Sequence, residues 1–544
     1  MPALAVRLTL APAIVFACAM LLPRAARADD PPAGGDVVEV IDEGSTPPTP
    51  GEAPKPPLAL VKEAPRADKF ELRGFSRLTV AGGLSPARVT PDRAVVDDRV
   101  GYDRAAATQQ AFLDLRYTRG KSIQVVVSGS LAYSAYLAEN AAGAGGEGLR
   151  FDSGRPEAVL REAYLGIYGE RLDLRIGQQR IVWGNSDGIR PNDVLNARDL
   201  RTRLQLDTEL LDLPTLAARA DLDLGLATLG LVVQPFFTPD RSSLYGGNWS
   251  LVQGDAPIAH RRLLGSYSQG RDRAEVESFQ SGIASSGGSK SALDGASVGT
   301  SLRFESGKVS SSFYYHWGLD RTPFTYLEPQ LAAELEAADS NALNGAVLDA
   351  LIKQQRRASS LYGGPLVVQY VRRHHIGADI STTAGPLVLR ADAAYDSAAT
   401  FAARQTLNSV ARPTVQGVAG IEYQTGDLFK MVAFEAWYMR LMGPELPIVP
   451  VLNQANSGPL LFVQENNVGF ANLVRWRLSG DFIVEVQSLL GLGPRWYMVR
   501  PEIGYNTSSF TIRAGLLLID GEAGSFGGYY RRNDTAYLTA RYSF

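Results

Sequence analysis

The chain has 544 residues, 45% of them hydrophobic and 20% charged, and its formal net charge is −3. So balanced a charge provides no basic surface for nucleic acid, and we expect no nucleic-acid partner. The single cysteine, Cys18, lies in the first apolar run. A mature chain without that run would have neither a disulfide nor a cysteine nucleophile.

The first residues have the layout of a secretory signal peptide. Arg7 precedes an apolar run that ends near Leu22, and the small-residue pattern Ala26-Arg27-Ala28 follows. This order predicts a signal peptide over residues 1–28, cleaved after Ala28, and therefore export from the cytoplasm. The alternative is an uncleaved anchor helix, because the apolar run is near the short end of the length that spans a membrane.

Residues 29–68 are rich in proline and acidic side chains. Such a composition cannot bury enough apolar surface to offset its ordering entropy, so we expect a disordered periplasmic tether. The short apolar stretch from Val37 to Ile41 resembles the energy-coupling box of TonB-dependent transporters, and its binding to a periplasmic partner stays open. Those transporters also carry a large plug domain, for which this tether leaves no room.

From Lys69 to the end, apolar residues fall into short segments of period two separated by turns. In the last segment Leu538, Ala540 and Tyr542 alternate with mostly polar neighbours. This pattern predicts an all-β fold over residues 69–544, a transmembrane antiparallel β-barrel of about eighteen strands in the outer membrane of a Gram-negative cell. Short and long connections should alternate around such a barrel, yet the outer connection from Gly491 to Arg495 is short where a long one is expected. Sixteen strands are therefore also possible.

The chain ends on Phe544, two residues after Tyr542. This ending resembles the terminal signal by which outer-membrane barrels are recognised, and it implies the barrel-assembly machinery as a partner alongside outer-membrane lipid. A homotrimer is compatible with such a barrel, although no strand shows an interface pattern distinct from a lipid-facing one.

One long outer connection carries a helical pattern. After Pro329, leucine, isoleucine and valine recur near helical spacing, which predicts a helical insertion within residues 328–357 of an extracellular loop. The helix could cap the barrel mouth or bind a partner, and the sequence leaves both roles open.

The densest polar stretch of the chain covers residues 171–203. We expect a strand from Arg171 to Trp183 in which Leu172, Leu174 and Ile176 face lipid while Arg175 and Gln179 face the lumen. A barrel of about eighteen strands is too wide to be filled by its own side chains. Its lumen should therefore hold water unless a loop folds inward.

This region resembles a family of largely uncharacterised proteobacterial outer-membrane barrels. In that family a Gly-x-Gln strand ends in Trp-Gly and leads into an Asn-Pro-x-Asp loop. Here the strand runs from Gly177-Gln178-Gln179 to Trp183-Gly184, and the loop counterpart is Asn196-Ala197-Arg198-Asp199, with Ala197 in place of proline. The segments Arg161-Glu162-Ala163-Tyr164-Leu165 and Leu389-Arg390-Ala391-Asp392 also resemble that family.

By analogy with porins, we expect residues 183–212 to fold inward as the constriction, with the bend at Trp183 and Gly184. The alternative is that the polar groups only tie the loop to the wall through charge-assisted hydrogen bonds. The candidate constriction residues are Glu162, Tyr164, Arg175, Gln179, Trp183, Asn185, Asp187, Arg190, Asp193, Asn196 and Asp199. Other lumen positions carry both signs of charge, so the sequence predicts no strong ion selectivity.

The sequence thus favours a porin-like channel for passive uptake or export of small solutes, whose chemistry it does not reveal. We expect no enzyme, no cofactor and no metal site, because the four histidines show no nucleophile or metal spacing. His374 and His375 are adjacent on a predicted strand, so their rings should point to opposite sides. The alternatives are a barrel that anchors partner-binding loops without an open pore and, less favoured, a TonB-coupled or catalytic barrel.

Overall fold

The structure is a computed structural model of the chain. It describes residues 68–84, 103–139, 149–201, 210–243, 248–251, 263, 292–327, 329–337, 350, 366–404, 408–423, 429–446, 448 and 460–544. The predicted signal peptide, almost all of the predicted tether and the stretch from Val37 to Ile41 lie outside these residues, so they remain predictions.

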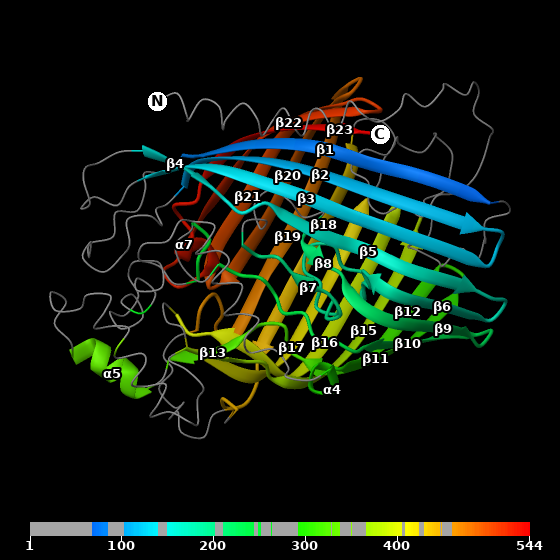
Figure 1. Cartoon of the computed structure of the whole chain (residues 1–544), viewed down its shortest axis with the longest axis horizontal. Coiled ribbons are helices and arrows are strands. Elements are labelled where there is room, and N and C mark those ends of the chain that lie inside the picture. The colour runs from blue at the N-terminus through cyan, green and yellow to red at the C-terminus, as the bar shows by residue number, and fades with distance from the viewer. Residues whose placement is uncertain are drawn as a thin grey trace. The chain divides into compact units, whose positions relative to one another are not determined.

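The described part of the chain is built almost wholly of β-strands (Figure 1). The wall strands are β1 (Lys69–Gly83), β2 (Asp103–Arg119), β3 (Ile123–Glu139), β5 (Glu157–Tyr168), β6 (Leu172–Gln179), β9 (Thr215–Asp223), β10 (Ala227–Gln234), β11 (Ser297–Ser306), β12 (Val309–Leu319), β15 (Arg372–Ala384), β16 (Leu387–Ala402), β17 (Ser409–Tyr423), β18 (Phe429–Leu441), β19 (Asn466–Ser479), β20 (Phe482–Gly493), β21 (Arg495–Asn506), β22 (Phe510–Gly521) and β23 (Thr535–Ser543). Shorter elements are β4 (Leu149–Ser153), β7 (Ala197–Arg198), β8 (Asp212–Leu213), β13 (Phe324–Leu327), β14 (Leu366–Gln369), α4 (Ala292–Gly295), α5 (Pro329–Ala337) and α7 (Phe526–Tyr529).

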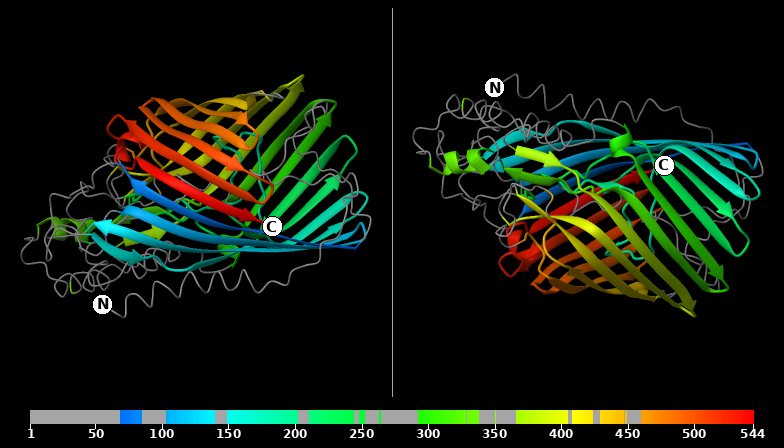
Figure 2. Two further views of the ribbon diagram at one scale, coloured as in Figure 1. Left: turned by 90° about the horizontal axis from the view of Figure 1, so that it is seen from above. Right: turned by 90° about the horizontal axis from the view of Figure 1, so that it is seen from below.

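The wall closes on itself. Each wall strand pairs antiparallel with the next along the chain, and β1 pairs with β23, which Figure 2 shows as the first strand in blue beside the last in red. Phe544 continues this seam, because its backbone N–H donates to Gly74 O at 3.0 Å. The main sheet also contains β4, which pairs only with β3, so the closed ring has 18 strands. The prediction of about eighteen strands is confirmed, and sixteen is excluded.

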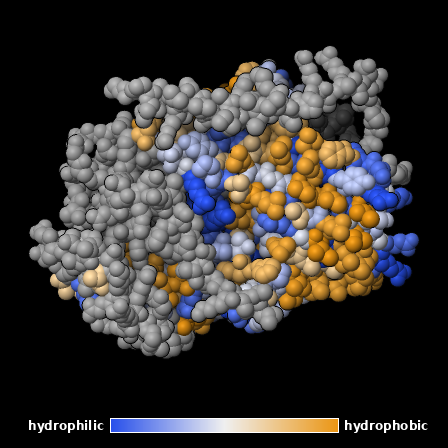
Figure 3. All heavy atoms as spheres, in the orientation of Figure 1, coloured by the Kyte–Doolittle hydropathy of each residue, from blue (hydrophilic) through white to orange (hydrophobic). Residues whose placement is uncertain are grey.

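The two faces of the wall differ, as the period-two pattern predicts. Large apolar side chains are exposed on one face, including Leu113, Leu115, Val125, Leu165 and Ile176. Figure 3 shows hydrophobic residues gathered over this outer face along β2, β3, β5 and β6. Polar and charged residues at the alternate positions, such as Asp114, Asp221, Asp392 and Glu435, are buried on the inner face.

Local predictions succeed and fail at identifiable places. The expected strand from Arg171 to Trp183 is wrong at its end, because β6 stops at Gln179. The helix expected after Pro329 is present as α5, with Leu331 and Leu335 fully buried, while most of residues 338–357 lie outside the described part. Strand β4 pairs only with β3, and β13 pairs with β14 in a separate two-stranded sheet outside the closed ring. Among the described residues, no helix is long and apolar enough to cross a membrane.

Candidate functional site

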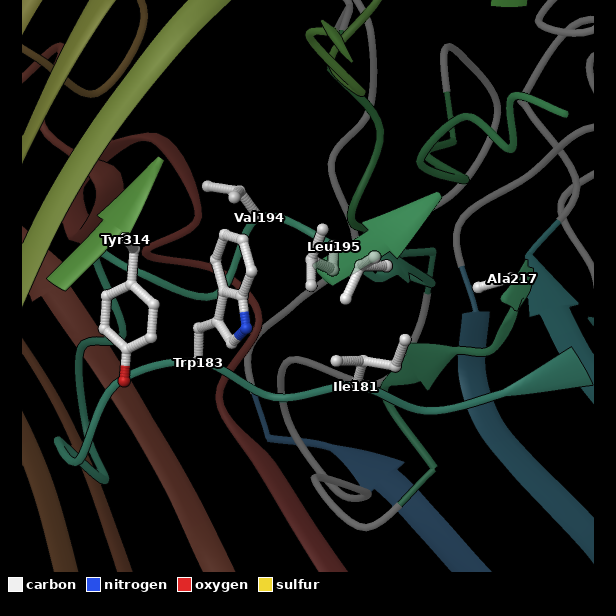
Figure 4. Close-up of a cluster of buried hydrophobic side chains, with 7 residues drawn as sticks. Ile181, Trp183, Val194, Leu195, Ala217 and Tyr314 are labelled. Atoms are coloured by element: carbon white, nitrogen blue, oxygen red, sulfur yellow. The ribbon is translucent and has the colours of Figure 1, made fainter. Parts of the chain in front are cut away.

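Residues 180–201, which follow β6, form what we call the β6–β9 segment. It begins where the Gln179 side chain leaves the strand pattern and donates from Nε2 to Ala217 O at 3.0 Å. An apolar cluster then anchors it, in which Trp183 stacks on Tyr314 of β12 with ring centroids 4.9 Å apart (Figure 4). Burial of such an aromatic pair contributes area and a specific geometry, so Trp183 holds this end of the segment against β12.

The chain turns sharply directly after Trp183. Gly184 has a φ of +90°, which non-glycine residues rarely adopt, and a Cβ added there would lie 2.6 Å from Asp392 Oδ2. Only glycine satisfies both the dihedral angle and the close approach to the wall. Gly184 is therefore a position that this segment requires to be glycine, while the inward bend expected at Trp183 and Gly184 stays a prediction.

The tip of the segment, residues 184–189, is bound to the wall through its backbone. The N–H groups of Asn185 and Ser186 donate to the Asp392 carboxylate of β16 at 3.2 Å. The N–H groups of residues 187–189 donate to the Glu435 carboxylate of β18 at 2.7, 2.8 and 3.3 Å. Two carboxylates thus accept hydrogen bonds from five consecutive N–H groups. Hydrogen bonds to an ionised acceptor are stronger than those between neutral groups.

Side chains extend the same contact. Asn185 donates from Nδ2 to Asp379 Oδ1 at 2.8 Å, and Asp379 also accepts from Tyr314 Oη. At the very tip, a Cβ on Gly188 would lie 2.7 Å from the Ala471 side chain of β19. The tip therefore contacts β15, β16, β18 and β19, all of them remote from β6 in the order of the wall.

Asp187 is the exposed carboxylate of the tip. Its side chain is 49% exposed and forms an ion pair with Arg390 of β16 at 2.8 Å, while Arg390 also pairs with Glu422 of β17 at 2.6 Å. Although half of the side chain is exposed, desolvation by the surrounding wall raises the pKa of Asp187 above its usual range; Arg390 lowers it, and the carboxylates of Glu435 and Glu422 add to the increase.

The base of the segment is held by its own ion pairs. Asp212, in β8, accepts from Arg180 at 2.7 Å and from Arg190 at 3.2 Å, and Arg190 also reaches Asp193 at 3.0 Å. Burial by itself would raise the pKa of Asp212, but the guanidinium groups of Arg190 and Arg180 outweigh it and hold the pKa below its usual range. Asp212 is thus the shared counter-ion of the base.

Asn196 and Asp193 connect the two ends of the base. Asn196 accepts from Ile181 N–H at 3.1 Å and donates to Ile181 O at 2.7 Å, and it also donates to Asp193 Oδ1 at 3.2 Å. A buried amide that pairs with both backbone groups of one residue acts as a bridge. The roles of Asn196 and Asp193 are therefore to hold the segment together.

Asp199 ends the segment in a second ion-pair group. It pairs with Arg201 at 2.6 Å, and Arg201 makes two bonds of 2.8 Å to Glu157 of β5. Asp240 accepts from the Arg198 N–H at 2.7 Å, and complete burial raises the pKa of Asp240 to about 6. These contacts attach the exit of the segment to the wall and to the loop after β10.

The remaining candidates lie on the wall beside the base. Arg175 lies over the rings of Tyr164 and Tyr168, at 5.9 and 5.7 Å from their centroids. Glu162 accepts from the Arg180 N–H at 3.3 Å. The candidate set therefore divides in two, with Asn185 and Asp187 at the tip and the other members at the base or on the adjacent strands.

The partners of these residues could not be read from the sequence. The period-two pattern places Asp392 and Glu435 on the lumen side but does not connect them with the segment, because their partners lie more than 200 residues away. Asp212 and Arg321 were missed altogether, although Arg321 donates to the carbonyl oxygens of Val194 and Leu195. No local signal in the sequence indicates these pairs.

The histidines remain outside the segment. His374 is exposed and His375 is fully buried, so their side chains point to opposite faces as expected. In the part of the chain that the structure covers, no group of three or more histidine, cysteine, aspartate or glutamate side chains could hold a metal ion.

Together these features define a class of protein: a closed antiparallel β-barrel of 18 strands with an apolar outer face and a polar inner face that binds a long segment after β6. Residues 95–476 match the family model described as "Protein of unknown function (DUF1302)", which is more than half of the chain, so the chain belongs to this family. The Gly-x-Gln and Asn-Pro-x-Asp motifs were not tested by this match and stay a prediction. No match was found among curated proteins.

The chain also aligns with solved structures along most of its length. OccK5 (OpdH) of Pseudomonas aeruginosa has 10% identity over 87% of this chain and 98% of its own, with a TM-score of 0.41. OmpF of Salmonella typhi, solved in complex with daunomycin, has 10% identity over 88% and 98%, with a TM-score of 0.39. The outer membrane channel DcaP of Acinetobacter baumannii has 12% identity over 88% and 98%, with a TM-score of 0.36. Similarity at this level says nothing of function, which must come from the residues of this chain.

Proposed function

We propose that this protein is an outer-membrane channel for passive passage of small solutes, and that residues 183–212 fold into the lumen as its constriction. The observation that carries the proposal is the binding of five consecutive backbone N–H groups of the tip by Asp392 and Glu435.

The location of these acceptors supports the constriction. Strand residues alternate between the two faces of a sheet, so in a closed barrel the buried carboxylates of β16 and β18 belong to the inner face. Between β6 and β16 the wall contains β9, β10, β11, β12 and β15. A segment that leaves β6 and contacts β12, β15, β16 and β18 through their inner-face residues lies inside the barrel, which supports its role as a constriction.

The outer face supports the membrane location. A belt of exposed leucine, isoleucine, valine and aromatic side chains surrounds the wall, and every backbone group of a closed barrel finds a partner within the wall. A barrel with this surface is stable in lipid, and the polar inner face would hold water. The cleaved signal peptide, the tether and recognition of Phe544 by the assembly machinery belong to the same proposal.

Conductance of the refolded protein in a planar bilayer tests the proposal. The intact protein is compared with a linker variant, in which a short glycine linker replaces residues 185–192. This variant leaves Trp183, Asp193 and Val194 in place. We expect steady conductance from the intact protein and a larger conductance from the variant. A large pore from the variant alone would indicate a gated barrel that the segment closes. Silence from both proteins, with correct folding verified, would overturn the channel and favour a barrel that anchors partner-binding loops.

A further inference from the structure

A polar pair lies on the outer face of the wall, where β19 and β20 run side by side. Asn472 and Ser488 are direct partners in the register of these strands, and Asn472 Nδ2 donates to Ser488 Oγ. Asn472 is also the register partner of Phe434 in β18, which is exposed on the outer face. Directly paired residues of an antiparallel sheet lie on the same face, so the polar pair points outward, away from the lumen.

The depth of this pair places it in the hydrocarbon of the membrane. It lies near the middle of β19, which runs from Asn466 to Ser479, and of β20, which runs from Phe482 to Gly493. A membrane-spanning strand reaches the headgroups at its two ends, so its middle faces lipid chains. The outward neighbours in the same register row are all apolar: Ile421, Phe434, Val499 and Leu518. The polar pair therefore interrupts an apolar surface.

The Asn472 amide has unmet hydrogen-bonding capacity at this depth. A primary amide carries two N–H donors and one acceptor oxygen, and Ser488 accepts from one of the two donors. Among the residues that the structure describes, no group bonds to the second N–H or to Oδ1 of Asn472. Lipid chains cannot form hydrogen bonds either, so an amide without further partners is unfavourable there.

A second copy of this chain supplies the missing partners. Two amides related by a two-fold axis form two reciprocal N–H···O bonds, which use the second N–H and Oδ1 of Asn472 while its bond to Ser488 remains. A two-fold axis along the membrane normal keeps each residue at the same depth in both copies, so Asn472 meets its own counterpart. Phe434 and Phe470 pack beside it on the same face, with ring centroids 5.1 Å apart, and add apolar contact area.

We propose that two copies of this protein form a dimer through the outer face of β18, β19 and β20, with Asn472 of each copy bonded to Asn472 of the other. The inference goes beyond the proposed channel function, because each barrel keeps its own lumen. A two-fold contact closes with two copies, whereas the homotrimer that the sequence left open needs two different faces on each copy.

Disulfide cross-linking of the refolded protein tests the contact directly. The only cysteine of the sequence is Cys18, so a chain that begins at Asp29 has no thiol other than one introduced. In phospholipid vesicles under mild oxidation, Asn472→Cys should form a cross-linked dimer on a non-reducing gel. Ser488→Cys should do the same, and it keeps the Asn472 amide. The control Ile376→Cys, at an exposed outward position of β15, should stay monomeric.

Loss of the amide tests the chemistry of the contact. Asn472→Leu removes the hydrogen bonds but keeps an apolar surface, and we expect the dissociation constant of the dimer to rise roughly tenfold, measured by sedimentation equilibrium in detergent. The matched control is Gln109→Leu, because Gln109 Nε2 donates to Ser76 Oγ at 2.9 Å on the outer face of a different sector, β1 and β2. This control should leave the dissociation constant unchanged.

The outcomes decide the dimer separately from the channel function. A monomeric intact protein, equal cross-linking of Ile376→Cys and the variants at the polar pair, or an unchanged dissociation constant for Asn472→Leu would overturn the dimer. Cross-linking through Gln109→Cys alone would place the contact on β1 and β2 and would overturn it as well. A cross-linked dimer without conductance in the intact protein and in the linker variant would overturn the channel function and leave the dimer standing.

Discussion

The tip and the base of the β6–β9 segment are held in different ways. The tip donates backbone N–H groups to carboxylates of remote wall strands, whereas at the base arginine side chains converge on Asp212 and Asp193. The base is therefore held mainly by ion pairs between side chains, with Asp212 of β8 at their centre, and the tip by backbone N–H groups that donate to the wall. This difference implies that substitutions can affect the two ends separately. A change at the base should lower stability, whereas a change at the tip should alter only the conductance.

The largest effect should come from Asp212→Asn. The change leaves Arg180 and Arg190 near each other without their shared counter-ion, and removing one partner of a buried ion pair costs about 3 kcal/mol. We expect this loss in the free energy of unfolding, measured by denaturant titration of the refolded barrel with tryptophan fluorescence. The control Glu522→Gln breaks an exposed pair with Arg495 and should leave the free energy of unfolding nearly unchanged. Equal losses in both variants would contradict this role of Asp212 as the shared counter-ion.

A smaller and more local effect is expected from Glu435→Gln. Glutamine keeps one acceptor oxygen but loses the charge that receives the N–H groups of residues 187–189, which should weaken the tip by about 1–3 kcal/mol. Single-channel records should show flicker or a raised mean conductance while the unfolding midpoint stays unchanged. Glu305→Gln, at the exposed end of β11, is the control. A lower midpoint with unchanged conductance would mean that Glu435 serves the barrel instead of the tip.

The smallest effect should be a pH dependence at Asp187. Burial raises the pKa of Asp187, so on acidification it loses its negative charge at a higher pH than an ordinary aspartate does. Arg390 then keeps its charge without this partner, and the tip becomes more positive. Chloride preference should therefore rise as the pH falls from neutrality, and Asp187→Asn should show the higher preference already at neutral pH with a flatter profile. The reversal potential in a potassium chloride gradient measures both, and an identical profile in the variant would contradict this role for Asp187.

Much of the barrel could be predicted because its information is local. Alternation such as Leu538, Ala540 and Tyr542 against Tyr537, Thr539 and Arg541 indicates a strand and both of its faces, since side chains in a strand point to alternate sides. Tight turns such as the one between Ser479 and Phe482 then set the order and direction of neighbouring strands. The end of β6 was misplaced because residues 180–183 keep a strand-like composition although the strand pairing with β9 ends at Gln179.

The sequence by itself determined the strands, their faces, the polar segment after β6 and most of its polar residues. The tertiary structure decided which carboxylate binds which N–H group and that Asp212 is the shared counter-ion of the base. The physical reason is that a strand pattern repeats over two residues, whereas the partners of Asn185 and Asp187 lie on strands that barrel closure brings near from more than 200 residues along the chain.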